Sequence, residues 1–478
     1  MFVSIKNFLF RNSTPGQTLA KNTFWLFFGQ ITGRLVRAAL IIAAARILGP
    51  ESWGAFSYVM SLIAFFLIFS DLGVSAIVTR ESAKDQTASY SYFATALALK
   101  LCLLALMVGI IIFGKSFLTA IPEAKILLPL VPLILILDSL RNFGFSISRA
   151  TEKMQWEAFN EIITNIGITA FGFYFLLRAP TSLNLTAAYA IGTAIGLGLT
   201  IATLWQYAKT IFTSFNYRLI KPLVSAALPF ALASFLGAIM INTDLLMLGW
   251  LRSPAEVGFY SAAQKPVLFL YTLAALFATS LFPTITKIGL QEKERARRLL
   301  EKALTVSLFL ALPMGLGGTL LGKEIVAAVF GPAYAPAVAT FQILMLTLII
   351  IYPSVIVSNT LLAYNQQKKF VVFSLLGAIG NVIFNFLLIP LFGIIGCAVA
   401  TILTQLIANG FIWRQLQGVI QFSIVSRLKK ILLATLIVLI IMFGLEKLNI
   451  NIFITVGSGV IAYLALLKIQ KEELLNLT

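Results

Sequence analysis

Runs of apolar residues recur along the whole chain and alternate with short polar segments. Each run is long enough to cross a bilayer, because a helix rises about 1.5 Å per residue and the hydrocarbon core is about 30 Å thick. The pattern predicts an all-α integral membrane protein with about 14 transmembrane helices. Their expected limits are 23–47, 54–79, 90–114, 120–143, 156–178, 185–208, 223–250, 257–286, 299–322, 337–362, 370–390, 393–416, 429–446 and 451–468.

A short motif recurs at corresponding places in the two halves. Segment 54–57, after the first run, reads Gly-Ala-Phe-Ser, and segment 258–261, after the seventh, reads Gly-Phe-Tyr-Ser. An even number of runs separates the copies, so they indicate parallel repeats related by an axis along the membrane normal. We therefore expect two pseudo-symmetric six-helix lobes plus two C-terminal helices.

The expected division of the chain follows from these repeats. It comprises a cytoplasmic tail or interfacial helix (1–22), an N-lobe with spans 1–6 (23–208), a cytoplasmic linker (209–222), a C-lobe with spans 7–12 (223–416), and spans 13–14 with a cytoplasmic C-terminus (417–478). The longest inner connection, 287–302, is expected to be a charged helix lying on the lipid headgroups or a docking site for a glycosyltransferase.

Composition and charge agree with a membrane protein. Hydrophobic residues make up 59% of the chain and charged residues 11%, whereas soluble domains are about 25% charged. The net charge of +18 does not indicate a nucleic-acid partner, because the basic residues cluster at span ends. They favour the inner segments by more than three to one, which predicts that both termini are cytoplasmic.

The first run carries two arginines deep in the predicted bilayer. Gln30, Arg34 and Arg37 are spaced i, i+4, i+7 and therefore share one helix face. A charge at that depth costs about 2.5–3.5 kcal/mol or more if it faces lipid. We therefore expect this face to line a protein interior or a water-filled cavity, either as a site for an anion or as an ion pair that fixes helix packing. Asp71 in the second run is a candidate partner of Arg34.

Other ionisable residues lie inside the predicted spans. Lys100 is near the middle of span 3, and Asp138 and Arg141 are placed for an i, i+3 pair near the inner end of span 4. The alternative for Arg141 is that it only extends to the headgroups. Asp244 and Lys265 are expected to pair across the hairpin between spans 7 and 8.

Cations outnumber carboxylates inside the spans, which favours an anionic substrate. We expect Arg34, Arg37, Lys100 and Lys265 to form a cationic lumen, with the other intramembrane polar residues supporting it or coupling it to an ion. Asn381 and Asn385, at i, i+4 in span 11, are expected either to bond sugar hydroxyls or to bridge helices.

Several kinds of chemistry are disfavoured. The chain has no His, and Cys102 and Cys397 lie in apolar runs, so no metal site is expected. Segment 317–323 matches the first seven positions of a P-loop, but Glu324 replaces the Ser or Thr that would hold Mg²⁺. No cofactor is expected, and coupling to H⁺ or Na⁺ is left open. The outer loops are too short for the acid and base groups of a membrane enzyme.

Five segments together resemble a known family. They are 44–57, Asp71-Leu72-Gly73, 244–249, 257–263 and 389–401. From about residue 20 to 416, their order and spacing resemble the polysaccharide transporter (O-antigen flippase) family of the multidrug/oligosaccharidyl-lipid/polysaccharide exporter superfamily. The resemblance implies two six-helix lobes around a central cavity. It also implies alternating access that moves undecaprenyl-diphosphate-linked oligosaccharide to the outer leaflet.

The sequence therefore predicts a transporter in the cytoplasmic (inner) membrane rather than an enzyme. Its expected partners are the lipid-linked oligosaccharide, the bilayer, and a polysaccharide polymerase or glycosyltransferases. The alternatives are a cation-coupled multidrug exporter of the same superfamily and a membrane-embedded polysaccharide polymerase. An exporter of cationic drugs would need an acidic lumen, whereas the excess charge in the spans is basic.

Overall fold

The described part of the chain is helical. The computed structural model describes residues 12, 14–84, 89–207, 214–289, 292–448 and 450–469, so most of the predicted tail and residues 209–213 of the predicted linker lie outside it. No β-strand occurs within these ranges. The helices are α2 (Pro15–Phe69), α3 (Val74–Lys84), α4 (Ser89–Phe113), α5 (Pro122–Leu127), α6 (Leu130–Ala150), α7 (Met154–Arg178), α8 (Ser182–Thr203), η1 (Tyr217–Leu219), α10 (Ile220–Leu251), α11 (Pro254–Gly289), α12 (Lys293–Leu320), α13 (Gly322–Phe330), η2 (Pro332–Ala337), α14 (Val338–Ala363), α15 (Gln367–Gln417), α16 (Val425–Lys447) and α17 (Ile452–Ile469).

Eleven helices in the described ranges are long and apolar enough to cross a membrane. Two of them, α2 and α15, each hold two predicted spans that meet at one non-helical glycine, Gly49 (φ 73°) and Gly393 (φ 58°). Counting each half separately and adding the shorter apolar helix α17 brings the number of spans close to the predicted fourteen. The turn expected over 48–57 is therefore a sharp kink, and the helix resumes at Pro50.

Two predicted spans are interrupted. The second ends at Phe69 and continues as α3 from Val74, so that four non-helical residues lie between the two parts. The fourth divides into α5 and α6 around Leu128 and Pro129. The first helix also begins eight residues earlier than expected, at Pro15.

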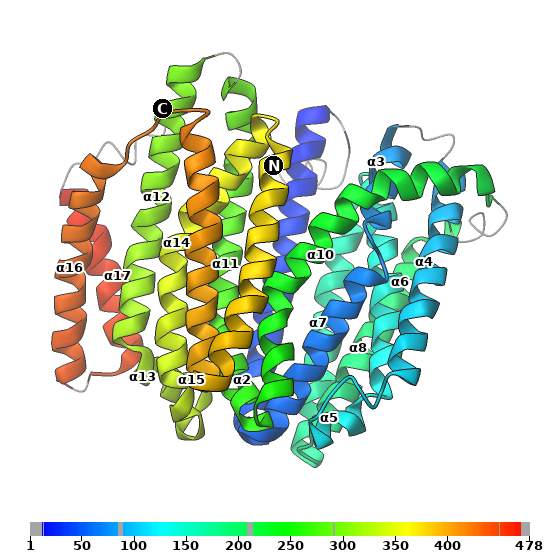
Figure 1. Cartoon of the computed structure of the whole chain (residues 1–478), viewed down its shortest axis with the longest axis horizontal. Coiled ribbons are helices and arrows are strands. Elements are labelled where there is room, and N and C mark those ends of the chain that lie inside the picture. Colours follow the sequence, from blue (N-terminus) through cyan, green and yellow to red (C-terminus); the bar gives the residue numbers. More distant parts are fainter. Residues whose placement is uncertain are drawn as a thin grey trace, which may run out of the picture. The chain divides into compact units, whose positions relative to one another are not determined.

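The chain forms two compact units, which divide between Ala255 and Glu256. In the first unit, α7 packs between α2 and α8, and α8 also packs on α6 (Figure 1). Small residues permit this close packing. A Cβ on Gly29 of α2 would lie 2.7 Å from the Ala158 backbone of α7, and one on Gly192 of α8 would lie 2.6 Å from the Ile168 backbone.

The second unit is built around α12 and α14. These two helices pack together, and α14 also packs on α15. Helix α16 packs against both α12 and α17. Tyr463 of α17 donates a hydrogen bond to the Phe309 carbonyl of α12 at 2.9 Å. The start of α12 covers part of the charged helix predicted over 287–302, and Arg297 pairs there with Glu301 at 3.2 Å, as its i, i+4 spacing predicts.

The predicted sequence repeat has the same local structure in each unit. After the kink or turn, both helices restart with a proline, Pro50 in one and Pro254 in the other. The repeated serine lies seven residues later in both, as Ser57 and Ser261, and both serines are buried. The repeated motif is therefore a helix start that is followed, in both copies, by a buried serine.

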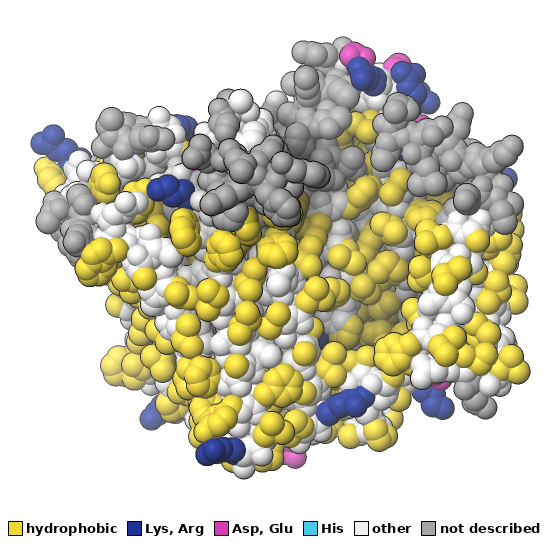
Figure 2. Space-filling view, turned by 180° about the vertical axis from the view of Figure 1, so that it is seen from behind, with side chains coloured by type: hydrophobic (Ala, Val, Ile, Leu, Met, Phe, Trp, Pro, Cys, Tyr) yellow, Lys and Arg dark blue, Asp and Glu magenta, His cyan; other side chains and the backbone are white. Residues whose placement is uncertain are grey.

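Large hydrophobic side chains cover the flanks of the helices. Figure 2 shows them over the visible face, with Lys and Arg mainly toward the helix ends. Phe113 of α4 is 88% exposed and Leu177 of α7 is 77% exposed. Apolar surface of this extent requires contact with lipid. The chain is therefore a multi-pass membrane protein, as predicted.

Candidate functional site

The predicted face of the first span lines a pocket in the first unit. Gln30, Arg34 and Arg37 of α2 meet residues of α6 and α7 around a cavity of about 250 Å³. We call this the arginine pocket; its lining residues are Leu26, Gly29, Gln30, Arg34, Arg37, Arg141, Asn142, Phe145, Arg149, Glu157, Ala158 and Glu161. The i, i+4, i+7 spacing thus predicted correctly which side chains share a cavity. Their role as substrate ligands stays a prediction.

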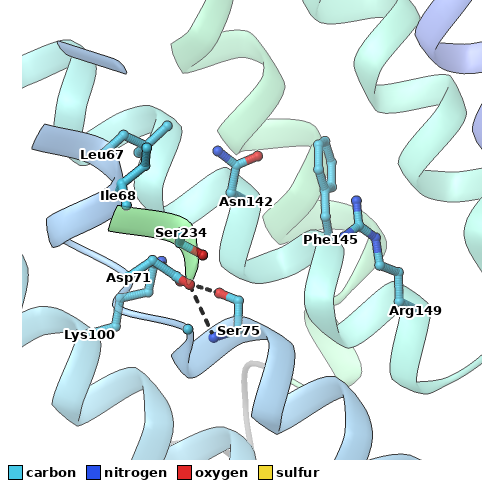
Figure 3. Close-up of a pocket in the computed structure, with 10 residues that line it drawn as sticks. Leu67, Ile68, Asp71, Ser75, Lys100, Asn142, Phe145, Arg149 and Ser234 are labelled. Atoms are coloured by element: carbon cyan, nitrogen blue, oxygen red, sulfur yellow. Dashed lines mark hydrogen bonds and ion pairs between the residues drawn. The ribbon is translucent and has the colours of Figure 1, made fainter. Parts of the chain in front are cut away.

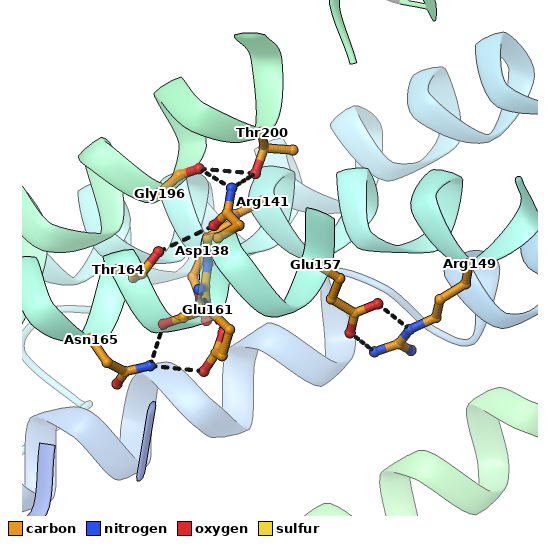
Figure 4. Close-up of polar contacts among 10 residues, drawn as sticks. Asp138, Arg141, Arg149, Glu157, Glu161, Thr164, Asn165, Gly196 and Thr200 are labelled. Atoms are coloured by element: carbon orange, nitrogen blue, oxygen red, sulfur yellow. Dashed lines mark hydrogen bonds and ion pairs between the residues drawn. The ribbon is translucent and has the colours of Figure 1, made fainter. Parts of the chain in front are cut away.

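Arg141 is held inside the protein rather than extended to the headgroups. Its guanidinium contacts Asp138 at 2.7 Å, as predicted, and Glu161 of α7 at 2.9 Å (Figure 4). It also lies 5.1 Å from the centre of the Phe145 ring. Only 9% of Arg141 is exposed, so the alternative of a headgroup contact is wrong. The two carboxylates fix the guanidinium at the pocket wall.

A second arginine of the pocket, Arg149, was not among the predicted site residues. It binds Glu157 through two hydrogen bonds, of 2.8 and 2.5 Å (Figure 4). The sequence placed Arg149 in an inner connecting segment, because a basic residue near a span end is usually a topology signal. The structure instead continues α6 to Ala150, so the side chain remains within reach of α7.

Positive charge predominates in the arginine pocket. Four arginines and two glutamates line it, and Asp138, which binds Arg141 from outside the lining, still leaves an excess of cations. In the described part of the chain, no carboxylate lies within ion-pair distance of Arg37. An anion that enters the pocket therefore meets a guanidinium that makes no direct ion pair, although Glu161 acts on it electrostatically from the same pocket.

A second pocket lies in the same unit, at the break after α2. Its volume is about 240 Å³, and it is formed by α2, α3, α4, α6 and α10 (Figure 3). We call this the Asp71 pocket; its lining residues are Leu67, Ile68, Asp71, Gly73, Ser75, Lys100, Asn142, Phe145, Arg149 and Ser234.

The backbone at this break is unusual. Leu72 and Gly73 both adopt positive φ angles, 41° and 77°, and such a conformation costs a non-glycine residue about 1–2 kcal/mol. A Cβ on Gly73 would also lie 2.7 Å from the Cβ of Phe230 on α10. Non-helical backbone at membrane depth is tolerated where it is buried in protein or lines a cavity. Here it lines the Asp71 pocket.

Asp71 pairs with Lys100 rather than with the predicted partner Arg34. The Lys100 ammonium, which is 1% exposed, lies 2.5 Å from Asp71 Oδ1. The Ser75 hydroxyl donates to the same oxygen, and the Ser75 amide donates to Oδ2 at 3.4 Å (Figure 3). Lys100 was predicted to contribute to a cationic lumen; its ammonium is paired with Asp71 in the lining of this pocket, and its role as a substrate ligand stays a prediction.

The two pockets share one wall. Asn142, Phe145 and Arg149 line both of them, and their i, i+3, i+7 spacing places them on one face of α6. The side chain of Asn142 makes no hydrogen bond within the described ranges. Sequence reasoning missed Asn142, because a single amide in an apolar span belongs to no pattern that would distinguish it.

The remaining predicted site residues lie outside these pockets. Asp244 is buried in α10, whereas Lys265 lies on α11 of the second unit, so their pairing stays a prediction. Asn381 and Asn385 are buried in α15, where the Asn385 amide donates to Asn381 at 3.1 Å. Among the described residues, no cluster of His, Cys, Asp or Glu is arranged to hold a metal ion.

Comparison with known proteins places this fold in a family. The model of the polysaccharide biosynthesis protein family matches residues 19–289, more than half of the chain. The chain belongs to this family. The MatE family model matches residues 229–387. Both matches confirm the predicted resemblance.

Relatives of this polysaccharide biosynthesis family member span most of its length. The capsular polysaccharide biosynthesis protein CapF of Staphylococcus aureus is 21% identical, over 82% of this chain and 97% of its own. The succinoglycan biosynthesis transport protein ExoT of Rhizobium meliloti is 21% identical, over 70% of this chain and 67% of its own. Family and relatives together indicate a transporter or flippase rather than an enzyme.

The fold also has a solved counterpart. The structure of the lipid II flippase MurJ in an inward closed conformation superposes with a TM-score of 0.77, at 17% identity, over 93% of this chain and 98% of its own. This likeness confirms the predicted all-α transporter fold.

Proposed function

We propose that this protein flips a polyprenyl-diphosphate-linked oligosaccharide across the cytoplasmic membrane, from the inner to the outer leaflet. The observation that carries the proposal is the arginine pocket, where four arginines and two glutamates line one cavity. Membership of the polysaccharide biosynthesis family supports the substrate class. Both termini would then be cytoplasmic, as the charge bias of the connecting segments predicts.

The pocket suits a diphosphate for a chemical reason. A guanidinium presents a planar pair of donors that matches two phosphate oxygens, and the bond is strengthened by charge. Arg34 and Arg37 share one face of α2 in this pocket and would make the main contacts with the diphosphate, whereas Arg141 and Arg149 are each paired with a carboxylate. The two paired arginines would orient it. Rocking of the lobes would carry the polar head across while the prenyl chain stays in lipid.

Complementation tests this function. In cells whose own flippase has been deleted, the wild-type chain should restore surface polymer, and Arg34→Ala or Arg37→Ala should reduce polymer by about tenfold or more. Arg178→Ala is the matched control, because Arg178 lies at the end of α7 against Tyr174 and outside the arginine pocket. Normal polymer from both pocket variants, at equal protein levels, would refute the proposal.

A second function has one observation in its favour. The MatE model matches residues 229–387, which supports a cation-coupled exporter of small cationic compounds. The excess of arginine in the pocket disfavours such compounds, because like charges repel in a site of low dielectric. Drug resistance on expression, without restored polymer, would support this alternative.

A further inference from the structure

The Asp71 pocket contains polar groups whose bonding capacity the protein does not use. The two side-chain donors on Asp71 both bind Oδ1, and Oδ2 has only the 3.4 Å contact with the Ser75 amide. A carboxylate oxygen can accept about two hydrogen bonds. The side chains of Asn142 and Ser234 make no hydrogen bond within the described part of the chain. The pocket therefore offers an acceptor, an amide and a hydroxyl together.

The charges of this pocket argue against an ion as its occupant. Lys100 is neutralised by Asp71, and Arg149 by Glu157. An anion would therefore compete with carboxylates that are already in place. A cation would meet one ammonium and one guanidinium against a single lining carboxylate. A neutral ligand rich in hydroxyl groups fits the remaining donors and acceptors better.

The backbone break adds a second, independent observation. The positive φ of Leu72 is a strained conformation, and it lies next to Asp71, whose side chain lines the cavity. Strained residues of this kind concentrate at ligand sites, where the surrounding structure maintains them. Helix breaks at mid-membrane form the substrate sites of many transporters.

The shared wall connects this pocket to the arginine pocket. Asn142 and Arg149 line both cavities and lie about 10 Å apart along α6, from the rise of about 1.5 Å per residue. In a glycosylated diphosphate, a single oxygen joins the sugar to the phosphate, so the two groups need adjoining sites. Two pockets with a common wall meet that requirement.

We infer that the Asp71 pocket binds the sugar attached to the diphosphate, through hydrogen bonds from its hydroxyl groups to Asp71 Oδ2, Asn142 and Ser234. This inference rests on the proposed function, in which the arginine pocket holds the diphosphate. Asn142, on the wall that the two pockets share, contacts the sugar and not the diphosphate, and it is the main specificity-determining residue of the pair.

Binding to purified protein in lipid nanodiscs tests this assignment. The probes are undecaprenyl diphosphate, the same lipid carrying N-acetylglucosamine, and soluble uridine-diphosphate N-acetylglucosamine. Wild-type protein should bind the glycosylated lipid at least tenfold more tightly than the bare lipid. Asn142→Ala should remove about tenfold of that affinity, the value of one or two hydrogen bonds to a buried site. The same variant should leave the affinity for the bare lipid unchanged.

Asn242→Ala is the matched control, because Asn242 lies on α10 outside both pockets and, among the described residues, bonds only its own helix, at the Ala238 carbonyl. Asn142 makes no hydrogen bond to the described protein, so its loss should not unfold the chain. A second variant, Ser234→Ala, should show the same selective loss.

The outcomes separate the two proposals. If the bare lipid does not bind wild-type protein, or Arg37→Ala leaves its affinity unchanged, the proposed function fails. If the bare lipid binds through Arg37 but the sugar adds no affinity, or Asn142→Ala weakens both lipids equally, the sugar site alone is overturned. Equal affinity for the soluble sugar nucleotide and the glycosylated lipid would assign the pockets to a soluble sugar diphosphate and overturn the lipid-linked ligand.

Discussion

Asp71 and Lys100 form an ion pair at the point where the second predicted span breaks, with 2.5 Å between the ammonium and Oδ1. The lysine comes from the middle of α4 and is almost completely buried, whereas 27% of the aspartate side chain remains exposed. The pair therefore joins two helices and also places a carboxylate at the edge of a cavity.

This pair should stabilise the unit only when both members are present. Lys100→Met leaves Asp71 without its cation, and Asp71→Asn leaves a buried ammonium without its anion. Each should cost about 2 to 3 kcal/mol, below the roughly 3–5 kcal/mol of a fully buried pair, because 27% of the Asp71 side chain is exposed. The double variant should recover most of that loss. Thermal unfolding in detergent measures all three proteins, and a double variant as unstable as the two single losses combined would contradict the interpretation.

Removing a carboxylate from the arginine pocket should strengthen anion binding. In Glu161→Gln, Arg141 keeps Asp138, and the new amide still accepts from Asn165. The pocket loses one negative charge, so its affinity for undecaprenyl diphosphate should rise roughly fivefold. Equilibrium binding gives the result, with Glu81→Gln as the control, since Glu81 lies on α3 against Arg80 and Lys84. Unchanged or weaker binding would show that Glu161 does not act through its charge.

Two glycines of α8 offer a matched test of helix packing. A Cβ on Gly196 would lie 2.2 Å from Thr164 Oγ1 and 2.9 Å from Arg141 Cδ, whereas one on Gly198 would meet nothing within 4 Å. Gly196→Ala should therefore lower the unfolding free energy by about 1–3 kcal/mol through overpacking. Gly198→Ala should be neutral or stabilising by up to about 1 kcal/mol, because alanine favours the helix. Melting temperatures compare the two, and equal effects would contradict close packing at Gly196.

The sequence predicted those features that arise within a single helix. Helical spacing alone placed Gln30, Arg34 and Arg37 on one cavity wall and joined Asp138 to Arg141. The apolar runs gave the number and approximate limits of most helices, because each run must satisfy its own backbone hydrogen bonds in lipid.

Contacts between helices could not be predicted in the same way. Lys100 lies 29 residues from Asp71, and nothing in either span indicates which cation meets which carboxylate. The break at Leu72 was hidden inside an apolar run, since only the following Gly73 suggests it. Arg149 resembled an ordinary topology signal, and only the length of α6 shows that it reaches the cavity.

The shared face of α6 has an evolutionary consequence. Because Asn142, Phe145 and Arg149 belong to one helix and line both cavities, a substitution at any of these three positions alters both cavities at once. The preferences of the two cavities for the head group should therefore change together in evolution. A chimera that receives α6 from a homologue with another polymer should acquire the donor's preference for the head group. Exchanging α2 and α3 without α6 should instead leave the two cavities fitted to different head groups.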